Sequence, residues 1–262
     1  MNIRQGLFGV VGAFMGCSVA TAGDMGPMTL TQVIHPVFSL QSGYASINSG
    51  GNTQRFMGEA FNAFNYTNSG SGKNTGFIGV FLGAEHVLPW VTRPGFFMQA
   101  GVEYNYFGKI GVNGINTVGV EPQTSTTYNY NYNVQTQQVL GTIKLFATTY
   151  ERFHPYGEVG LGAAFNHAGQ YNATTTETGS INLTPGFSNL NQTQFSYSLG
   201  LGVDTQVSTK IRVGLGYRYS NFGSTSLGNG IVTFNNLHAP VPFNISSNTY
   251  ANQLIARISY IA

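Results

Sequence analysis

Eight segments of the chain alternate between apolar and polar residues at every second position, and this pattern limits the fold more than any other feature. They cover residues 37–48, 75–88, 95–108, 133–149, 156–167, 193–207, 211–221 and 249–260. Successive side chains of a strand point to opposite faces, so each segment is predicted to be a strand with one apolar and one polar face. Each is at least as long as the roughly 9–11 residues that a tilted strand needs to cross a membrane.

The connections between these segments alternate in length. Long stretches rich in Gly, Asn, Ser and Thr follow the first, third, fifth and seventh segments, whereas the short PWVTRP, YERFHP and STK stretches follow the others. Long loops at one end and tight turns at the other are typical of outer-membrane barrels. The sequence therefore predicts an all-β fold over residues 37–262. This is a transmembrane, antiparallel, up-and-down barrel of eight strands with long extracellular loops and short periplasmic turns.

The first 22 residues have the pattern of a secretory signal peptide. Arg4 supplies the positive charge, residues 6–19 form an apolar core, and Ala-Thr-Ala at 20–22 is a small-residue cleavage site. The core is shorter than the about 20 residues of a membrane-spanning helix. A lipoprotein signal acylated at Cys17 is the alternative, but the usual aliphatic residue three positions earlier is missing. We predict export, a periplasmic lead-in over residues 23–36, and a mature chain without a disulfide.

Two segments within the long connections allow specific predictions. RFMGEAFNAFNY (Arg55–Tyr66) fits a short amphipathic helix, because its aromatic residues have helical spacing, and it also fits an extension of the first hairpin. YNYNYNV (Tyr128–Val134) alternates Tyr and Asn. It predicts a strand that enters the membrane through a girdle of aromatic residues.

Charged residues make up only 8% of the chain and the net charge is +2, which gives no reason to expect nucleic acid as a partner. The charged residues of the predicted strands share the polar face, where four acids balance four bases. They are Glu85, Glu103, Lys144, Glu158, Asp204, Arg212, Arg218 and Arg257.

Alternation alone leaves open which face meets water, because a soluble barrel or sandwich would place the charged face outside. Three features favour an inward charged face. Glycines such as Gly214 and Gly216 make room beside the arginines, the charges balance, and tyrosines near the ends of the apolar face suit a membrane interface. We therefore expect the apolar face to meet lipid. The eight charged residues are expected to pair inside the lumen as a structural network, because an unpaired buried charge is costly.

With FHPYGEVGLGAAF (residues 153–165) followed by IRVGLGYRYSNFG (residues 211–223), the sequence resembles the opacity-protein-like, outer-membrane-protein-A-like family of eight-stranded barrels. The resemblance covers about residues 37–262 and implies the outer membrane of a Gram-negative bacterium, a periplasmic N-terminus and loops on the cell surface. The expected partners are outer-membrane lipid and lipopolysaccharide, and the barrel-assembly machinery during biogenesis. One departure is that such barrels usually end on an aromatic residue, whereas here Tyr260 is followed by Ile-Ala.

No catalytic, cofactor or metal site is predicted. Outer-membrane lipid A deacylases carry His-x-Ser-Asn, in which the histidine activates the serine, but this chain has Arg218, Ser220 and Asn221 there. Arginine stays protonated and cannot act as the base. The five histidines are dispersed without metal-ligand or Ser-His-acid spacing, and His154 is predicted to lie in a turn. They are His35, His86, His154, His167 and His238.

The leading hypothesis is a non-enzymatic barrel whose lumen is filled and salt-bridged, because eight strands leave room only for side chains. Its long loops would contact a host surface, another bacterial component or the envelope, in adhesion or in an envelope-structural role. The alternatives are a narrow, porin-like channel for small or hydrophobic solutes and, with less support, a lipid-modifying enzyme.

Overall fold

The computed structural model describes residues 34–49, 53–57, 63–68, 72–88, 95–119, 125–148, 152–177, 184–234, 237–241 and 243–262. The chain divides into two units, residues 1–32 and 33–262, and all described residues belong to the second. The predicted signal peptide and most of the predicted lead-in lie outside the described residues, whereas residues 34–36 belong to the first strand. Within the described ranges, no helix is long and apolar enough to span a membrane.

The described chain forms eight long and six short strands. The long strands are β1 (Ile34–Asn48), β4 (Lys73–Val87), β5 (Phe96–Phe107), β7 (Thr126–Ala147), β8 (Phe153–Glu177), β10 (Leu190–Ser208), β11 (Ile211–Ser226) and β14 (Ser246–Ile261). The short strands are β2 (Thr53–Met57), β3 (Ala63–Asn68), β6 (Ile110–Val118), β9 (Thr184–Phe187), β12 (Gly230–Phe234) and β13 (Leu237–Val241). All eight predicted strands are confirmed, and β7 and β8 run well beyond their predicted ends.

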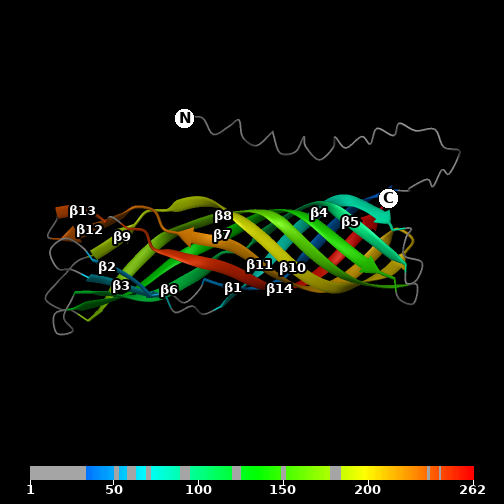
Figure 1. Cartoon of the computed structure of the whole chain (residues 1–262). Coiled ribbons are helices and arrows are strands. Elements are labelled where there is room, and N and C mark those ends of the chain that lie inside the picture. Colours follow the sequence, from blue (N-terminus) through cyan, green and yellow to red (C-terminus); the bar gives the residue numbers. More distant parts are fainter. Residues whose placement is uncertain are drawn as a thin grey trace, which may run out of the picture. The chain divides into compact units, whose positions relative to one another are not determined.

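The long strands pair antiparallel in the order β1-β4-β5-β7-β8-β10-β11-β14, and β14 pairs again with β1. Each therefore has two hydrogen-bonded neighbours. Figure 1 shows these strands strongly tilted with respect to their common direction, as in barrels generally. The predicted eight-stranded antiparallel barrel is confirmed.

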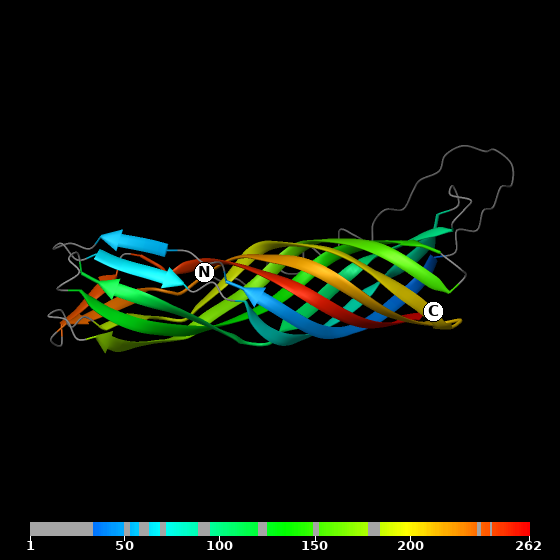
Figure 2. The same ribbon diagram turned by 90° about the horizontal axis from the view of Figure 1, so that it is seen from below.

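The six short strands lie at the end of the barrel strands that is remote from Ala262 (Figure 1, Figure 2). There β6 pairs with the outer part of β7, and β3 and β2 extend the same sheet, while β9, β12 and β13 form a second sheet. We name this part the head. It comprises the six short strands together with residues 126–134, 168–177 and 243–248. The long connections thus carry short strands that the sequence did not predict.

Both segments singled out in the long connections are strands where they are described. Residues 55–57 and 63–66 belong to the β2–β3 hairpin, so the helix is wrong for them. The hairpin does not extend the first one, because β3 pairs with β6 and neither β2 nor β3 pairs with β1 or β4. Residues 58–62 lie outside the described part. Tyr128, Tyr130 and Tyr132 are in β7, but each is only 2% exposed. The predicted aromatic girdle at these positions is wrong, because the alternating asparagines face outward and the tyrosines face inward.

The outward faces of the long strands are apolar. Their most exposed large side chains include Leu82, Ile143, Leu161, Leu201, Leu215 and Leu254, each more than half exposed. So continuous an apolar surface is unfavourable in water, because burial of apolar area is what drives folding there. The soluble alternative required the apolar face to be inside and is wrong.

Two glycines of β8 offer a matched test of how tightly neighbouring strands pack. A Cβ atom at Gly162 would overlap the backbone carbonyl oxygen of Val139 on β7, whereas one at Gly157 would meet nothing within 4 Å. Gly162→Ala is expected to lower the free energy of unfolding by about 1–3 kcal/mol, because the backbone of β7 must move. Gly157→Ala is expected to be neutral or slightly stabilising. Urea titration of protein refolded into lipid vesicles measures both, and equal midpoints would contradict the expectation.

Candidate functional site

The interior of the barrel contains a group of charged residues that come from seven strands. We name it the charge layer. It consists of Glu85 (β4), Glu103 (β5), Lys144 (β7), Glu158 (β8), Asp204 (β10), Arg212 and Arg218 (β11) and Arg257 (β14), and all eight are buried. Four carboxylates and four cations make the layer neutral overall. The structure therefore places every predicted lumen residue inside, and the contacts below show which of them meet.

Several arginine–carboxylate pairs of the charge layer cross the lumen between strands that are not neighbours. Arg212 binds Glu85 through two contacts, with Nη1 2.5 Å from Oε2 and Nη2 3.1 Å from Oε1. Arg257 Nη2 donates to Glu158 Oε2 at 2.9 Å. The two contacts of Arg212 with Glu85 are the strong form of the arginine–carboxylate interaction and fix that guanidinium in one orientation.

Arg218 has no exposed surface and contacts both carboxylate and amide partners. Its Nη1 donates to Glu103 Oε1, and its Nε and Nη2 lie 3.0 and 2.8 Å from Gln253 Oε1. Lys144 Nζ lies 3.8 Å from both Glu103 Oε2 and Glu158 Oε2 and links the two carboxylates. A buried charge is tolerated best when it is both paired and hydrogen-bonded. Arg218 meets both conditions, whereas Lys144 is paired with two carboxylates without a hydrogen bond to either.

Buried amides and hydroxyls connect the charged groups. Asn105 Nδ2 donates to Glu103 Oε1 at 2.8 Å, and Gln41 Nε2 donates to Asn105 Oδ1 at 2.8 Å. Ser220, which stands where the deacylases have their nucleophile, is fully buried and accepts a hydrogen bond from Gln253 Nε2 at 2.8 Å. It therefore faces the lumen rather than lipid.

Each cation of the charge layer also lies over an aromatic ring. The distances from the cation to the ring centroid are 4.2 Å for Lys144–Phe81, 4.5 Å for Arg212–Phe97, 4.8 Å for Arg257–Tyr156 and 5.8 Å for Arg218–Phe77. The rings attract the cations and fill the space between them. These rings were not predicted, although they occupy inward positions on strands that carry the charged residues. Assigning the aromatic residues to the inward or outward face by their alternating positions would have predicted them.

His154 corrects a further prediction. It was expected in a turn, but it belongs to β8, which pairs with β10 as far as Phe153 and Thr205. Its side chain is 3% exposed and lies edge-on to Phe97, with 5.3 Å between the ring centroids.

The described residues hold no cluster of three His, Cys, Asp or Glu that could bind a metal ion.

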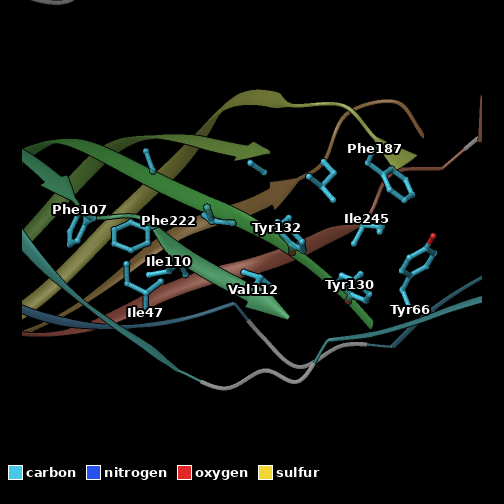
Figure 3. Packing of buried hydrophobic residues seen from close by; sticks show 14 of the residues in the cluster. Ile47, Tyr66, Phe107, Ile110, Val112, Tyr130, Tyr132, Phe187, Phe222 and Ile245 are labelled. Carbon is cyan, nitrogen blue, oxygen red and sulfur yellow. The ribbon is translucent and has the colours of Figure 1, made fainter. Parts of the chain in front are cut away.

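An apolar cluster fills the interior from the charge layer into the head, and we name it the aromatic plug (Figure 3). Its members include Ile47, Tyr66, Phe107, Ile110, Val112, Tyr130, Tyr132, Phe187, Phe222 and Ile245. Phe107 packs between Phe77 and Phe222, with centroid distances of 5.5 and 4.9 Å. Figure 3 shows these side chains directed toward one another from separate strands. The interior of this part is therefore filled mainly by apolar side chains, in addition to the predicted salt-bridged charges.

Tyr66 of β3 lies deep in the part of the plug that the head surrounds. It is 1% exposed, and its ring contacts Tyr130 and Phe187 at centroid distances of 5.6 and 5.9 Å. Burial raises the pKa of its hydroxyl far above the ordinary value, and the neighbouring Tyr171 adds to the shift. The phenol therefore stays neutral at every physiological pH.

Side chains hold the β2–β3 hairpin against the start of β14. Gln54 Nε2 donates to the carbonyl oxygen of Ser246 at 2.8 Å, and the Ser246 N–H donates to Gln54 Oε1 at 3.2 Å. Phe56 stacks on Phe243 with 3.8 Å between centroids and 3° between ring planes. These contacts fix the hairpin within the head, against the chain segment that leads into β14.

Eight tilted, antiparallel strands with an apolar outer surface and a filled interior define a membrane β-barrel. Residues 37–244 match the family described as outer membrane protein beta-barrel domain, and the chain belongs to this family. Its location is the bacterial outer membrane, as predicted. In such barrels the short turns face the periplasm and the long connections face the cell exterior, so the head lies outside the cell.

Solved structures with a similar fold include Neisserial surface protein A, OprG from Pseudomonas aeruginosa and the outer membrane protease OmpT from Escherichia coli. Neisserial surface protein A is 13% identical over 85% of this chain and 96% of that chain, with a TM-score of 0.38. The values are 10%, 86%, 95% and 0.41 for OprG, and 12%, 91%, 99% and 0.35 for OmpT. Likeness at this level concerns the fold alone. Among curated proteins, none matches the sequence.

Proposed function

We propose that this outer-membrane barrel acts by binding a surface partner through its head and does not pass solutes through its lumen. The observation that carries the proposal is the filled interior. The charge layer and the aromatic plug occupy the lumen one after the other, and Lys144, Arg218 and Phe222 have no exposed surface. The charge layer has a structural role in this proposal, because its groups are engaged with one another across the lumen.

The exposed surface of the head supplies the chemistry for binding. Asn113 on β6, Asn131 on β7 and Asn172 on β8 lie opposite one another across the sheet, and all three are exposed. Carboxamides donate and accept hydrogen bonds without a counter-charge. Strand pairing fixes their spacing, which lowers the entropic cost of binding. This row suits a neutral, hydroxyl-rich partner, and we propose an uncharged glycan on a cell surface.

The binding test uses the full chain in lipid nanodiscs and an array of neutral glycans. Asn131→Asp places a charge in the centre of the row and is expected to weaken binding about tenfold, the equivalent of one or two hydrogen bonds. Asn248→Asp makes the same chemical change on β14, outside the row, and is expected to leave binding unchanged. Loaded nanodiscs that bind no better than empty ones, or equal losses in both variants, would overturn the proposal.

The conductance test addresses the lumen separately. In planar bilayers the parent protein is expected to produce no stable current steps, because no continuous water path crosses two packed layers of side chains. Large, long-lived steps from folded protein would support the channel alternative instead. This result would leave the glycan measurement interpretable, since the two experiments probe different parts of the molecule.

A further inference from the structure

The outer wall of the barrel changes from apolar to polar over two successive levels on three adjacent strands. Along β7, β8 and β10 the outward-facing residues are apolar as far as Val139, Phe165 and Phe195. At the level of Phe165 its neighbours Gln137 and Thr193 are already polar, and one level further on Gln135, His167 and Asn191 lie opposite one another across the strands. A barrel strand is apolar on its outer face only across the hydrocarbon region, so this polar row lies at the level of the lipid headgroups of the outer leaflet.

Two adjoining cavities of about 70 and 180 Å³ open in the wall at this level, and both are lined by His167. Lys109, Asn133 and Gln135 line the first, and Asn191 is among the residues that line the second. The described lining residues of the two cavities include no aspartate or glutamate. The walls therefore offer an ammonium group, an imidazole and several amides, a set that favours a ligand with negative charge and hydroxyl groups.

Hydrogen bonds hold the walls of the cavities in place. Asn133 Nδ2 donates to Gln170 Oε1 at 2.5 Å, and His167 Nδ1 lies 2.5 Å from Asn191 Oδ1. Gln170 has a φ of 57° and is the one non-glycine residue with positive φ in the described part of the chain. Beside it the β7–β8 register shifts between Asn131 and Asn133. Bulges of this kind redirect side chains out of the regular strand pattern.

We propose that these cavities form one binding site for the phosphorylated sugar headgroup of an outer-leaflet glycolipid. Lys109 and His167 bind the phosphate, because a cationic donor is the strongest partner for that group. The amides of Asn133 and Gln135 hydrogen-bond the sugar hydroxyls. The acyl chains lie against the apolar wall below, where Phe165 also lines the second cavity. This site lies where the barrel wall meets the head, and it shares no residue with the glycan-binding row of Asn113, Asn131 and Asn172.

The test measures binding of bisphosphorylated lipid A to the full chain refolded in detergent, by native mass spectrometry. Lys109→Gln combined with His167→Gln removes the cationic groups and is expected to weaken binding about tenfold. Lys210→Gln makes the same change in the turn at the other end of the barrel and is expected to bind like the parent. Heat-modifiable gel mobility verifies that each protein is folded.

Ligand variants identify the source of the recognised group. Dephosphorylated lipid A is expected to bind the parent about tenfold more weakly than lipid A does. The double variant is expected to bind lipid A and dephosphorylated lipid A equally well. Equal binding of lipid A by the parent and the double variant would overturn the site. If phosphatidylglycerol bound the parent as tightly as lipid A does, the sugar part of the proposal would be overturned. Inorganic phosphate binding as tightly as lipid A would overturn the lipid part. As a second readout, lipid A is expected to slow amide exchange in residues 131–137 of the parent and not of the double variant.

Discussion

Replacing Arg218 by alanine is expected to lower the free energy of unfolding by about 3–5 kcal/mol, because it breaks a buried ion pair from one side. Arg218 has no exposed surface and binds Glu103 and Gln253. Without it, Glu103 remains buried and keeps an ion pair with Lys144, at 3.8 Å between Nζ and Oε2. The charge layer would then hold four carboxylates against three cations.

A double variant separates the lost charge balance from the lost packing. Arg218→Met with Glu103→Gln removes both charges and keeps most of the volume, so it is expected to recover a large part of the stability. Urea titration in lipid vesicles and the temperature of the heat-modifiable gel shift measure it. Lys210→Ala, a change at an exposed position, serves as the control. A stability of Arg218→Ala equal to that of the parent, or a double variant weaker than either single one, would contradict the pairing argument.

The second large effect is expected from the aromatic plug. Phe222 has no exposed surface, and its ring lies 4.9 Å from that of Phe107. Phe222→Ala is expected to cost about 3–5 kcal/mol, because it removes a buried ring and leaves a cavity that rigid strands cannot close. The hydrogen bond from Asn166 Nδ2 to the Phe222 carbonyl oxygen involves the backbone and remains possible in the variant.

Phe195→Ala is the matched control for the plug, because Phe195 is 66% exposed on the outer face of β10. It removes the same ring from the lipid side, where the acyl chains adapt and no cavity remains. The same unfolding measurement is expected to show a much smaller loss. Equal losses for the two variants would show that burial within the plug does not control stability. Neither variant is expected to produce ion currents, since the charge layer still blocks the lumen.

The strands and their two faces could be predicted from the sequence because a strand in a barrel wall has two environments of opposite polarity. Leu215 and Arg218 illustrate this: one is 70% exposed on the lipid side and the other is fully buried. Their odd or even position along the strand places them on opposite faces, and glycine placement and charge balance indicate which face is inside. The contacts between particular charges could not be predicted, since Arg212 and Glu85 meet only through the geometry of the whole ring.

The head could not be predicted for a different physical reason. Its strands are short and rich in Asn, Thr and Gly, and their apolar residues pack on a shared cluster rather than on a sheet face that the sequence repeats. The alternation of Tyr and Asn in Tyr128–Tyr132 predicts a strand, but it does not indicate which of the two faces is buried. The tyrosines were therefore assigned to a membrane interface, whereas they form part of the plug. The ring of Tyr66 reaches the same cluster from the β2–β3 hairpin, a segment whose aromatic spacing also fitted a helix.

The ion pairs of the charge layer have a consequence for how the barrel folds. They join residues that are 127, 115 and 99 positions apart, in Arg212–Glu85, Arg218–Glu103 and Arg257–Glu158. Because these partners face one another across the lumen, they meet only when β14 reaches β1 at the last step of assembly. Interactions that form after the transition state slow unfolding and leave the folding rate nearly unchanged. We therefore expect the lumen charges to determine how long the barrel persists once inserted, while the lipid-facing strands determine how quickly it inserts.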